Sequence, residues 1–73
     1  MYKNRLTLWE MLKDENKELI EQSREEYPYM TESCIASLKN ATFVIDLTVG
    51  QLDNLTMLCE YTDWNKVYKL FNN

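Results

Sequence analysis

The 73-residue chain contains no histidine, one glycine, one proline and two cysteines. The absence of histidine excludes the Ser-His and Cys-His pairs of nucleophilic catalysis and the histidine ligands of most zinc and di-iron helical sites. A glycine-rich phosphate-binding loop is excluded as well, because Gly50 is the only glycine. We therefore expect a protein without enzymatic activity and without a bound metal or cofactor.

The chain also lacks long apolar runs. No run approaches the roughly 20 residues that span a bilayer, and the first residues, MYKNRLTLWEM, lack the apolar region of a secretory signal. Cys34 and Cys59 each lie beside aliphatic residues and form no Cys-x-x-Cys pair, so we expect them to be reduced and buried. The sequence thus predicts a cytoplasmic protein that does not bind membranes.

Acidic residues outnumber basic residues in this chain. Eight Lys and Arg against twelve Asp and Glu give a net charge of −4, and the basic residues form no cluster. Affinity for phosphates depends on clustered Lys and Arg that displace counterions. We therefore expect no direct binding to nucleic acid.

Apolar residues make up 45 % of the chain, which is enough for a packed core without a metal or a disulfide framework. One glycine and one proline leave little room for hairpins. The sequence predicts a single all-α domain over residues 1–73, a compact bundle of three or four short helices. Its core should consist of Trp9, Leu12, Leu19, Ile20, Ile35, Leu38, Leu52, Leu55, Leu58, Val67 and Phe71.

Two helices are expected in the first half. Thr7 followed by Glu10 forms a capping-box pattern, which predicts a first helix from Thr7 to Tyr27. Pro28 should end it, because proline disfavours helix in the preceding residue. The stretch TESCIASLKNA reads as a short second helix with Thr31 as its cap and Asn40 near its exit.

The second half begins with FVIDLT, whose β-branched and aromatic residues suit a strand, although no partner strand is evident. We interpret it as an extended connector. Thr48 and Gln51 form another capping box that opens a third helix, VGQLDNLTMLCEY. Thr62 or Asp63 can cap a last helix, in which four side chains share one face: Trp64, Val67, Tyr68 and Phe71.

The segment 13–27, KDENKELIEQSREEY, holds six acidic and three basic side chains. A wheel at about 100° per residue places the basic Lys13, Lys17 and Arg24 between an apolar stripe and the opposite side. On that opposite side lies a row of carboxylates that we name the acidic ridge: Glu10, Asp14, Glu18, Glu21 and Glu25.

The acidic ridge has two interpretations. Surface helices are commonly charged, so it is in the first place a solvated face. However, like charges at i,i+4 are unfavourable by a few tenths of a kcal/mol each, and a helix shaped only for stability would mix the signs. Carboxylates one turn apart, roughly 5–6 Å, resemble the phosphate spacing of a nucleic acid. Such a row could occupy a groove that normally holds DNA or RNA.

Two non-catalytic functions are compatible with these features. The first is a protein-binding module, a small acidic inhibitor that imitates nucleic acid on a polymerase, sliding clamp or nuclease. Small acidic proteins encoded by phages resemble this chain in size and charge. The alternative is a structural or regulatory helical module that forms a homodimer or docks through an apolar face made by Met57 and Tyr61, since Met and Tyr are over-used at interfaces.

A remote alternative is an Mg-dependent nucleotide hydrolase. The pairs Glu15-x-x-Glu18, Glu18-x-x-Glu21 and Glu60-Tyr-Thr-Asp63 loosely resemble the Glu-x-x-Glu and Glu-x-x-Asp pairs of the all-α nucleotide pyrophosphohydrolases. They lie further apart than in that family's pattern, and the wheel turns Glu18 and Glu21 toward solvent. A Mg²⁺ site would need these carboxylates to converge in a shielded pocket.

Overall fold

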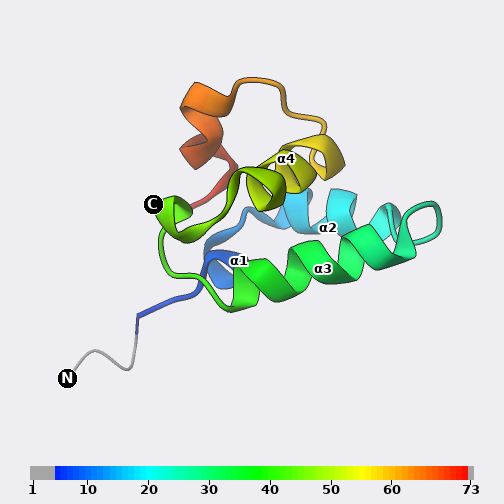
Figure 1. Ribbon diagram of the computed structural model, residues 1–73, viewed down its shortest axis with the longest axis horizontal. Helices are drawn as coiled ribbons and strands as arrows, with labels where there is room; N and C mark the ends of the chain where they lie inside the picture. Colours follow the sequence, from blue (N-terminus) through cyan, green and yellow to red (C-terminus); the bar gives the residue numbers. More distant parts are fainter. Residues whose placement is uncertain (1–4, 73) are drawn as a thin grey trace.

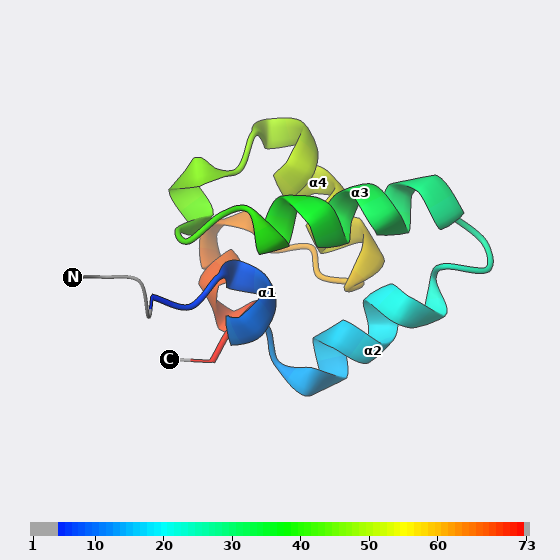
Figure 2. The same cartoon turned by 90° about the horizontal axis from the view of Figure 1, so that it is seen from below.

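The longest helix, α3 (Pro28–Lys39), runs along the lower side of the molecule in Figure 1. In the computed structural model, which describes residues 5–72, it packs against α1 (Leu8–Met11), α2 (Asp14–Gln22) and α4 (Val49–Leu58), as Figure 1 and Figure 2 show. Two 3-10 segments, η1 (Val44–Asp46) and η2 (Trp64–Leu70), complete the described chain. The prediction of a small all-α bundle is confirmed for these residues.

Helix α3 begins earlier than expected. Pro28 occupies its first turn, where the missing N–H costs nothing and the fixed φ suits a helix. Thr31 was expected to cap this helix, and that prediction is wrong, because the residue lies inside it and is fully buried. Its hydroxyl is hydrogen-bonded to that of Ser23 over 2.7 Å, which ties α3 to the turn after α2. The predicted exit at Asn40 is confirmed.

The expected continuous helix from Thr7 to Tyr27 is wrong. The capping box between Thr7 and Glu10 is present, but it opens only the four residues of α1. Leu12 and Lys13 then adopt extended backbone, and α2 ends at Gln22, before a turn that leads to Pro28. A wheel drawn through the whole segment therefore misplaces its faces.

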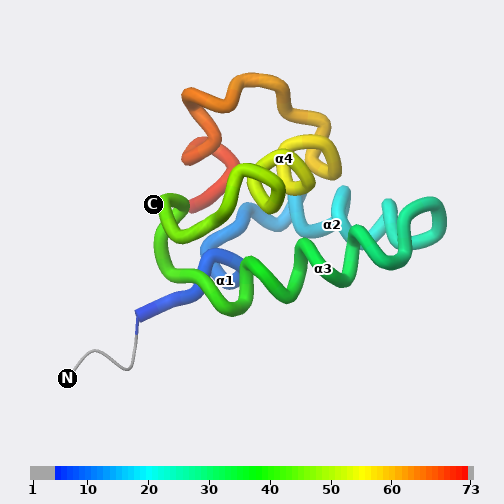
Figure 3. The backbone as a smooth tube through the Cα atoms, in the orientation of Figure 1, coloured from blue at the N-terminus to red at the C-terminus, as the bar shows by residue number. Residues whose placement is uncertain are grey.

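The break at Leu12 is stabilised by the C-terminal segment, which returns alongside it (Figure 3). Leu12 pairs with Phe71 in an antiparallel bridge: the N–H of Lys13 donates to the carbonyl of Leu70 over 3.0 Å, and the N–H of Asn72 donates to that of Met11 over 2.6 Å. These bonds replace the helical ones lost at the break. Leu12 itself is fully buried, which contributes about 1.5–3 kcal/mol.

Asn16 adds a side-chain bond to the same pairing. It is buried, and its amide Nδ2 donates to the carbonyl of Leu70 over 2.9 Å. The polar side chain thus occupies the apolar side of α2 between Leu12 and Ile20, where it binds the returning chain. Within residues 5–72, every buried side-chain nitrogen or oxygen has a hydrogen-bond partner.

In the second half of the chain, the structure agrees better with the elements predicted from the sequence. The capping box of Thr48 and Gln51 opens α4 as predicted. The connector expected to be extended contains the 3-10 turn η1. The last segment is a kinked 3-10 helix in place of an α-helix, and Asp63 caps it by accepting from the N–H of Asn65 over 3.1 Å.

The core is close to the predicted one but not identical. Trp9, Leu19 and Leu52 were expected inside and are only half-buried. Leu8 and Leu70 are buried although they were not on the predicted list. The remaining predicted core residues are buried: Leu12, Ile20, Ile35, Leu38, Leu55, Leu58, Val67 and Phe71.

The first testable prediction concerns Asn16. Asn16→Ala should lower the free energy of unfolding by about 1–2 kcal/mol, because a buried hydrogen bond to the Leu70 carbonyl is lost. Urea denaturation followed by circular dichroism measures the change. Gln22→Ala, at the exposed end of α2, is the control and should stay within about 0.5 kcal/mol of wild type. Equal losses in the two variants would contradict the role of Asn16.

Candidate partner-binding surface

The net negative charge of the protein is concentrated in helix α2 and the turn that follows it. Residues 14–27 hold six carboxylates against Lys17 and Arg24, a net charge of −4, which equals the net charge of the whole chain. All six acidic residues are exposed. We name this set the acidic surface: Asp14, Glu15, Glu18, Glu21, Glu25 and Glu26.

The predicted acidic ridge does not form one continuous row. Glu10 belongs to α1, on the other side of the break, and Glu25 lies in the turn after α2, so only Asp14, Glu18 and Glu21 share a helix. Glu10 is also engaged locally, since its carboxylate accepts from the backbone N–H of Thr7 over 2.8 Å. The backbone N–H and the hydroxyl of Thr7 hold the pKa of Glu10 below its usual value.

Two basic residues neutralise part of the acidic surface. Lys17 lies 3.9 Å from Asp14. Arg24 contacts Glu21 over 2.9 Å and also pairs with Glu32 on α3. The Asp14–Lys17 and Glu21–Arg24 contacts are both i,i+3 pairs of opposite charge. Four members of the acidic surface have no ion-pair partner within residues 5–72: Glu15, Glu18, Glu25 and Glu26.

Met57 and Tyr61 do not form the apolar face that was expected. Helix α4 ends at Leu58, so Tyr61 lies beyond it and not one helical turn above Met57. Tyr61 packs against the core, and its hydroxyl donates to the carbonyl of Lys66 over 3.2 Å. Met57 is 47 % exposed and remains available at the surface.

A cleft of about 360 Å³ opens between the C-terminal ends of α2 and α4, and we name it the α2–α4 cleft. One wall comes from α2 and the residues after it, and the other from the end of α4 and from Glu60, two residues beyond that helix. Apolar side chains and two carboxylates share the lining. The lining residues are Leu19, Gln22, Ser23, Glu26, Tyr27, Met57, Leu58 and Glu60.

Glu60 at this cleft has an unusual backbone conformation, with φ of 55°. The N–H of Tyr61 donates to the carbonyl of Thr56 over 2.8 Å, and the N–H of Glu60 donates to that of Met57 over 3.1 Å. This pattern is a Schellman motif, and its left-handed position favours glycine. A side chain at that position costs roughly 1–2 kcal/mol.

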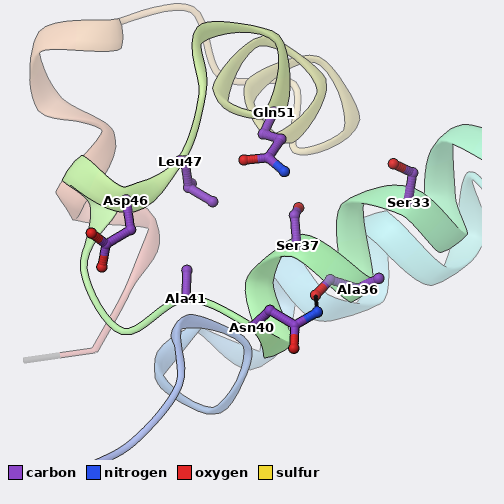
Figure 4. A pocket seen from close by; sticks show the side chains of 8 residues that line it. All are labelled: Ser33, Ala36, Ser37, Asn40, Ala41, Asp46, Leu47 and Gln51. Atoms are coloured by element: carbon purple, nitrogen blue, oxygen red, sulfur yellow. Dashed lines mark hydrogen bonds between the residues drawn. The ribbon is translucent and has the colours of Figure 1, made fainter.

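A second cleft, of about 310 Å³, lies between α3 and the segment from η1 to α4 (Figure 4). Three of its polar side chains already bind backbone groups of nearby residues. Ser37 donates to a carbonyl one turn earlier over 2.8 Å, as does Asn40 over 3.0 Å, and the amide oxygen of Gln51 accepts from the N–H of Thr48 over 2.9 Å. These three side chains therefore already have hydrogen-bond partners within the fold.

Three exposed apolar side chains belong to η1 or lie within three residues of it in the sequence. Ile45 is 89 % exposed, Val49 71 % and Phe43 52 %. The guanidinium of Arg5 lies 4.9 Å from the centre of the Phe43 ring, a cation–π distance. We name Phe43, Ile45 and Val49 the apolar patch.

The two cysteines are buried and form no disulfide, as predicted. Burial raises the pKa of the Cys34 thiol to about 11. Burial, together with the nearby Cys34, raises the pKa of the Cys59 thiol to about 12. Both groups are therefore protonated at neutral pH and unreactive as nucleophiles.

The pairs that resemble those of the nucleotide pyrophosphohydrolases do not converge. Glu15, Glu18 and Glu21 are exposed on α2. Among residues 5–72, no group of three or more His, Cys, Asp or Glu side chains is placed to hold a metal ion. In the same part of the chain, no helix has the length and apolarity needed to cross a membrane.

Comparison with protein families, with curated proteins and with solved structures gave no match to this chain.

The second testable prediction uses the conformation of Glu60. Glu60→Gly should raise the free energy of unfolding by about 0.5–1 kcal/mol, because glycine adopts a positive φ without steric cost. Glu18→Gly, inside α2, is the matched control and should lose about 1 kcal/mol. Both values come from urea denaturation. Destabilisation of similar size in the two variants would show that residue 60 is not left-handed in solution.

Proposed function

We propose that this protein is a non-catalytic binding module whose acidic surface occupies the basic groove of a nucleic-acid-binding protein. The observation that carries the proposal is the confinement of the whole net charge of −4 to residues 14–27. The rest of the chain is electrically balanced. Such segregation creates a directed field, which steers association with a positively charged surface.

The geometry of α2 supports recognition of a groove that binds a phosphate backbone. A short helix with an exposed acidic side presents a convex row of negative charge, and residues one turn apart on it are about 5–6 Å from each other. Four carboxylates of the surface have no ion-pair partner within residues 5–72. Their charge is thus available to Lys and Arg side chains of a partner.

Occupation of such a groove excludes its usual ligand. A polymerase, a sliding clamp or a nuclease whose basic channel is filled by α2 cannot hold DNA or RNA there. The protein would therefore act as a competitive inhibitor, and it would need no affinity for nucleic acid itself. Its own lack of a basic cluster agrees with that role.

The second candidate function is self-association through an apolar face. The apolar patch of Phe43, Ile45 and Val49 favours it, since Ile45 and Val49 are 89 % and 71 % exposed. Surface patches of this kind often mark protein contacts. It replaces the face that was expected from Met57 and Tyr61. In this case the acidic surface would serve solubility alone.

The third testable prediction separates the two functions by one substitution and a matched control. Glu18→Lys changes the net charge by +2 within the acidic surface, whereas Asp53→Lys makes the same change on α4, at another exposed residue. Each variant is immobilised, exposed to cell extract, and the bound proteins are identified by mass spectrometry. Wild type and Asp53→Lys should enrich nucleic-acid-binding proteins, and Glu18→Lys should lose at least about tenfold of that capture.

The captured proteins should also be released by added DNA or RNA, and by salt. Raising ionic strength from 0.1 to 1 M shortens the Debye length from about 10 Å to about 3 Å, which screens the attraction. Equal loss in the two Lys variants would show that only total charge matters. Self-association through the apolar patch would be favoured by two results together. Capture would survive high salt but be abolished by Ile45→Ser, and the protein would sediment as a dimer.

A further inference from the structure

The α2–α4 cleft combines two features that the acidic surface alone does not have. Its walls include apolar groups, since Leu19 and Tyr27 line one side and Met57 the other. Two carboxylates, Glu26 and Glu60, lie in the same lining. An open cleft of about 360 Å³, whose lining combines apolar side chains with polar and negative groups, suits a long side chain that is apolar along its stem and positive at its end.

The backbone adds negative potential at the same place. Helices α2 and α4 both end at this cleft, and neither has a basic residue in its last turn; both lie wholly within the described residues. The C-terminus of a helix carries the equivalent of roughly half a negative charge, which a nearby cation stabilises. Arg24, the first basic residue after α2, is held by Glu21 and Glu32 and does not line the cleft.

The Schellman motif at the end of α4 sets the position of Glu60 at the cleft. Its φ of 55° lies in a region where glycine would be more stable. Here the left-handed residue supplies one of the two carboxylates of the cleft.

We propose that the α2–α4 cleft binds an arginine side chain of the partner protein. The guanidinium would receive carboxylate contacts from Glu26 and Glu60 and would stack on the ring of Tyr27, while its stem would lie against Leu19 and Met57. Arginine fits better than lysine, because its planar group forms paired hydrogen bonds with carboxylates and stacks on aromatic faces. This inference rests on the proposed function, since it names the group in the basic groove that the protein recognises.

The probe for the experiment is N-acetyl-arginine-N-methylamide, titrated into the ¹⁵N-labelled full chain and followed by amide chemical shifts. The shifts of Tyr27, Met57 and Glu60 should saturate with one common dissociation constant. The citrulline analogue has the same shape without the charge and should not saturate. The lysine analogue should bind at least about threefold more weakly.

Two double variants locate the site. Glu26→Gln/Glu60→Gln should weaken probe binding about three- to tenfold, because two charge-assisted contacts are lost at a partly exposed site. Glu15→Gln/Glu18→Gln removes the same charge from α2 outside the cleft and should change binding less than about twofold. All four residues are exposed, so both variants should keep the wild-type circular dichroism spectrum.

Three results would overturn the proposal: shifts spread along α2 without saturation, equal binding of the citrulline or lysine analogue, or full binding by the Glu26→Gln/Glu60→Gln variant. Self-association through the cleft would appear as the same shifts on raising protein concentration without probe, and this too would overturn it. None of these results decides whether α2 enters a basic groove, which the capture experiment with Glu18→Lys tests separately.

Discussion

The pairing of the C-terminal segment with the break between α1 and α2 is the constraint on which the rest of the structure depends. Three hydrogen bonds join the segment 11–16 to Leu70 and Asn72, and one of them comes from the buried side chain of Asn16. These bonds hold the turn between α1 and α2 in place, and they join residues from nearly opposite ends of the sequence. Because Leu12 is fully buried at this point, the two ends of the chain close over the same core.

This pairing also decides which residues can act together at the surface. It leaves Glu10 on α1 and sets α2 as a separate short helix that carries most of the acidic surface. The ends of α2 and α4 both line the α2–α4 cleft, where apolar side chains and two carboxylates lie together. The proposed function therefore depends on where α2 is held as much as on its charges.

Local signals in the sequence were sufficient to predict where a helix begins when a capping box opens it. The capping boxes at Thr7 and Thr48 both form as predicted. The break after Met11 could not be predicted from periodicity, because its hydrogen bonds come from residues nearly sixty positions away. One signal was available: Asn16, a poor helix former, interrupts the apolar stripe between Leu12 and Ile20. The cleft was missed because it requires the relative placement of two helix ends, although its residues Glu60 and Met57 were already singled out.

The backbone conformation at the break is the most direct test of this account. Carbon-13 chemical shifts of the labelled protein report helix or extended backbone residue by residue. Helical shifts for 8–11 and 14–22, interrupted by extended shifts at Leu12 and Lys13, are predicted. An unbroken run of helical shifts from Leu8 to Glu26 would contradict the account, because α2 would then be part of one long helix and the acidic ridge would be continuous.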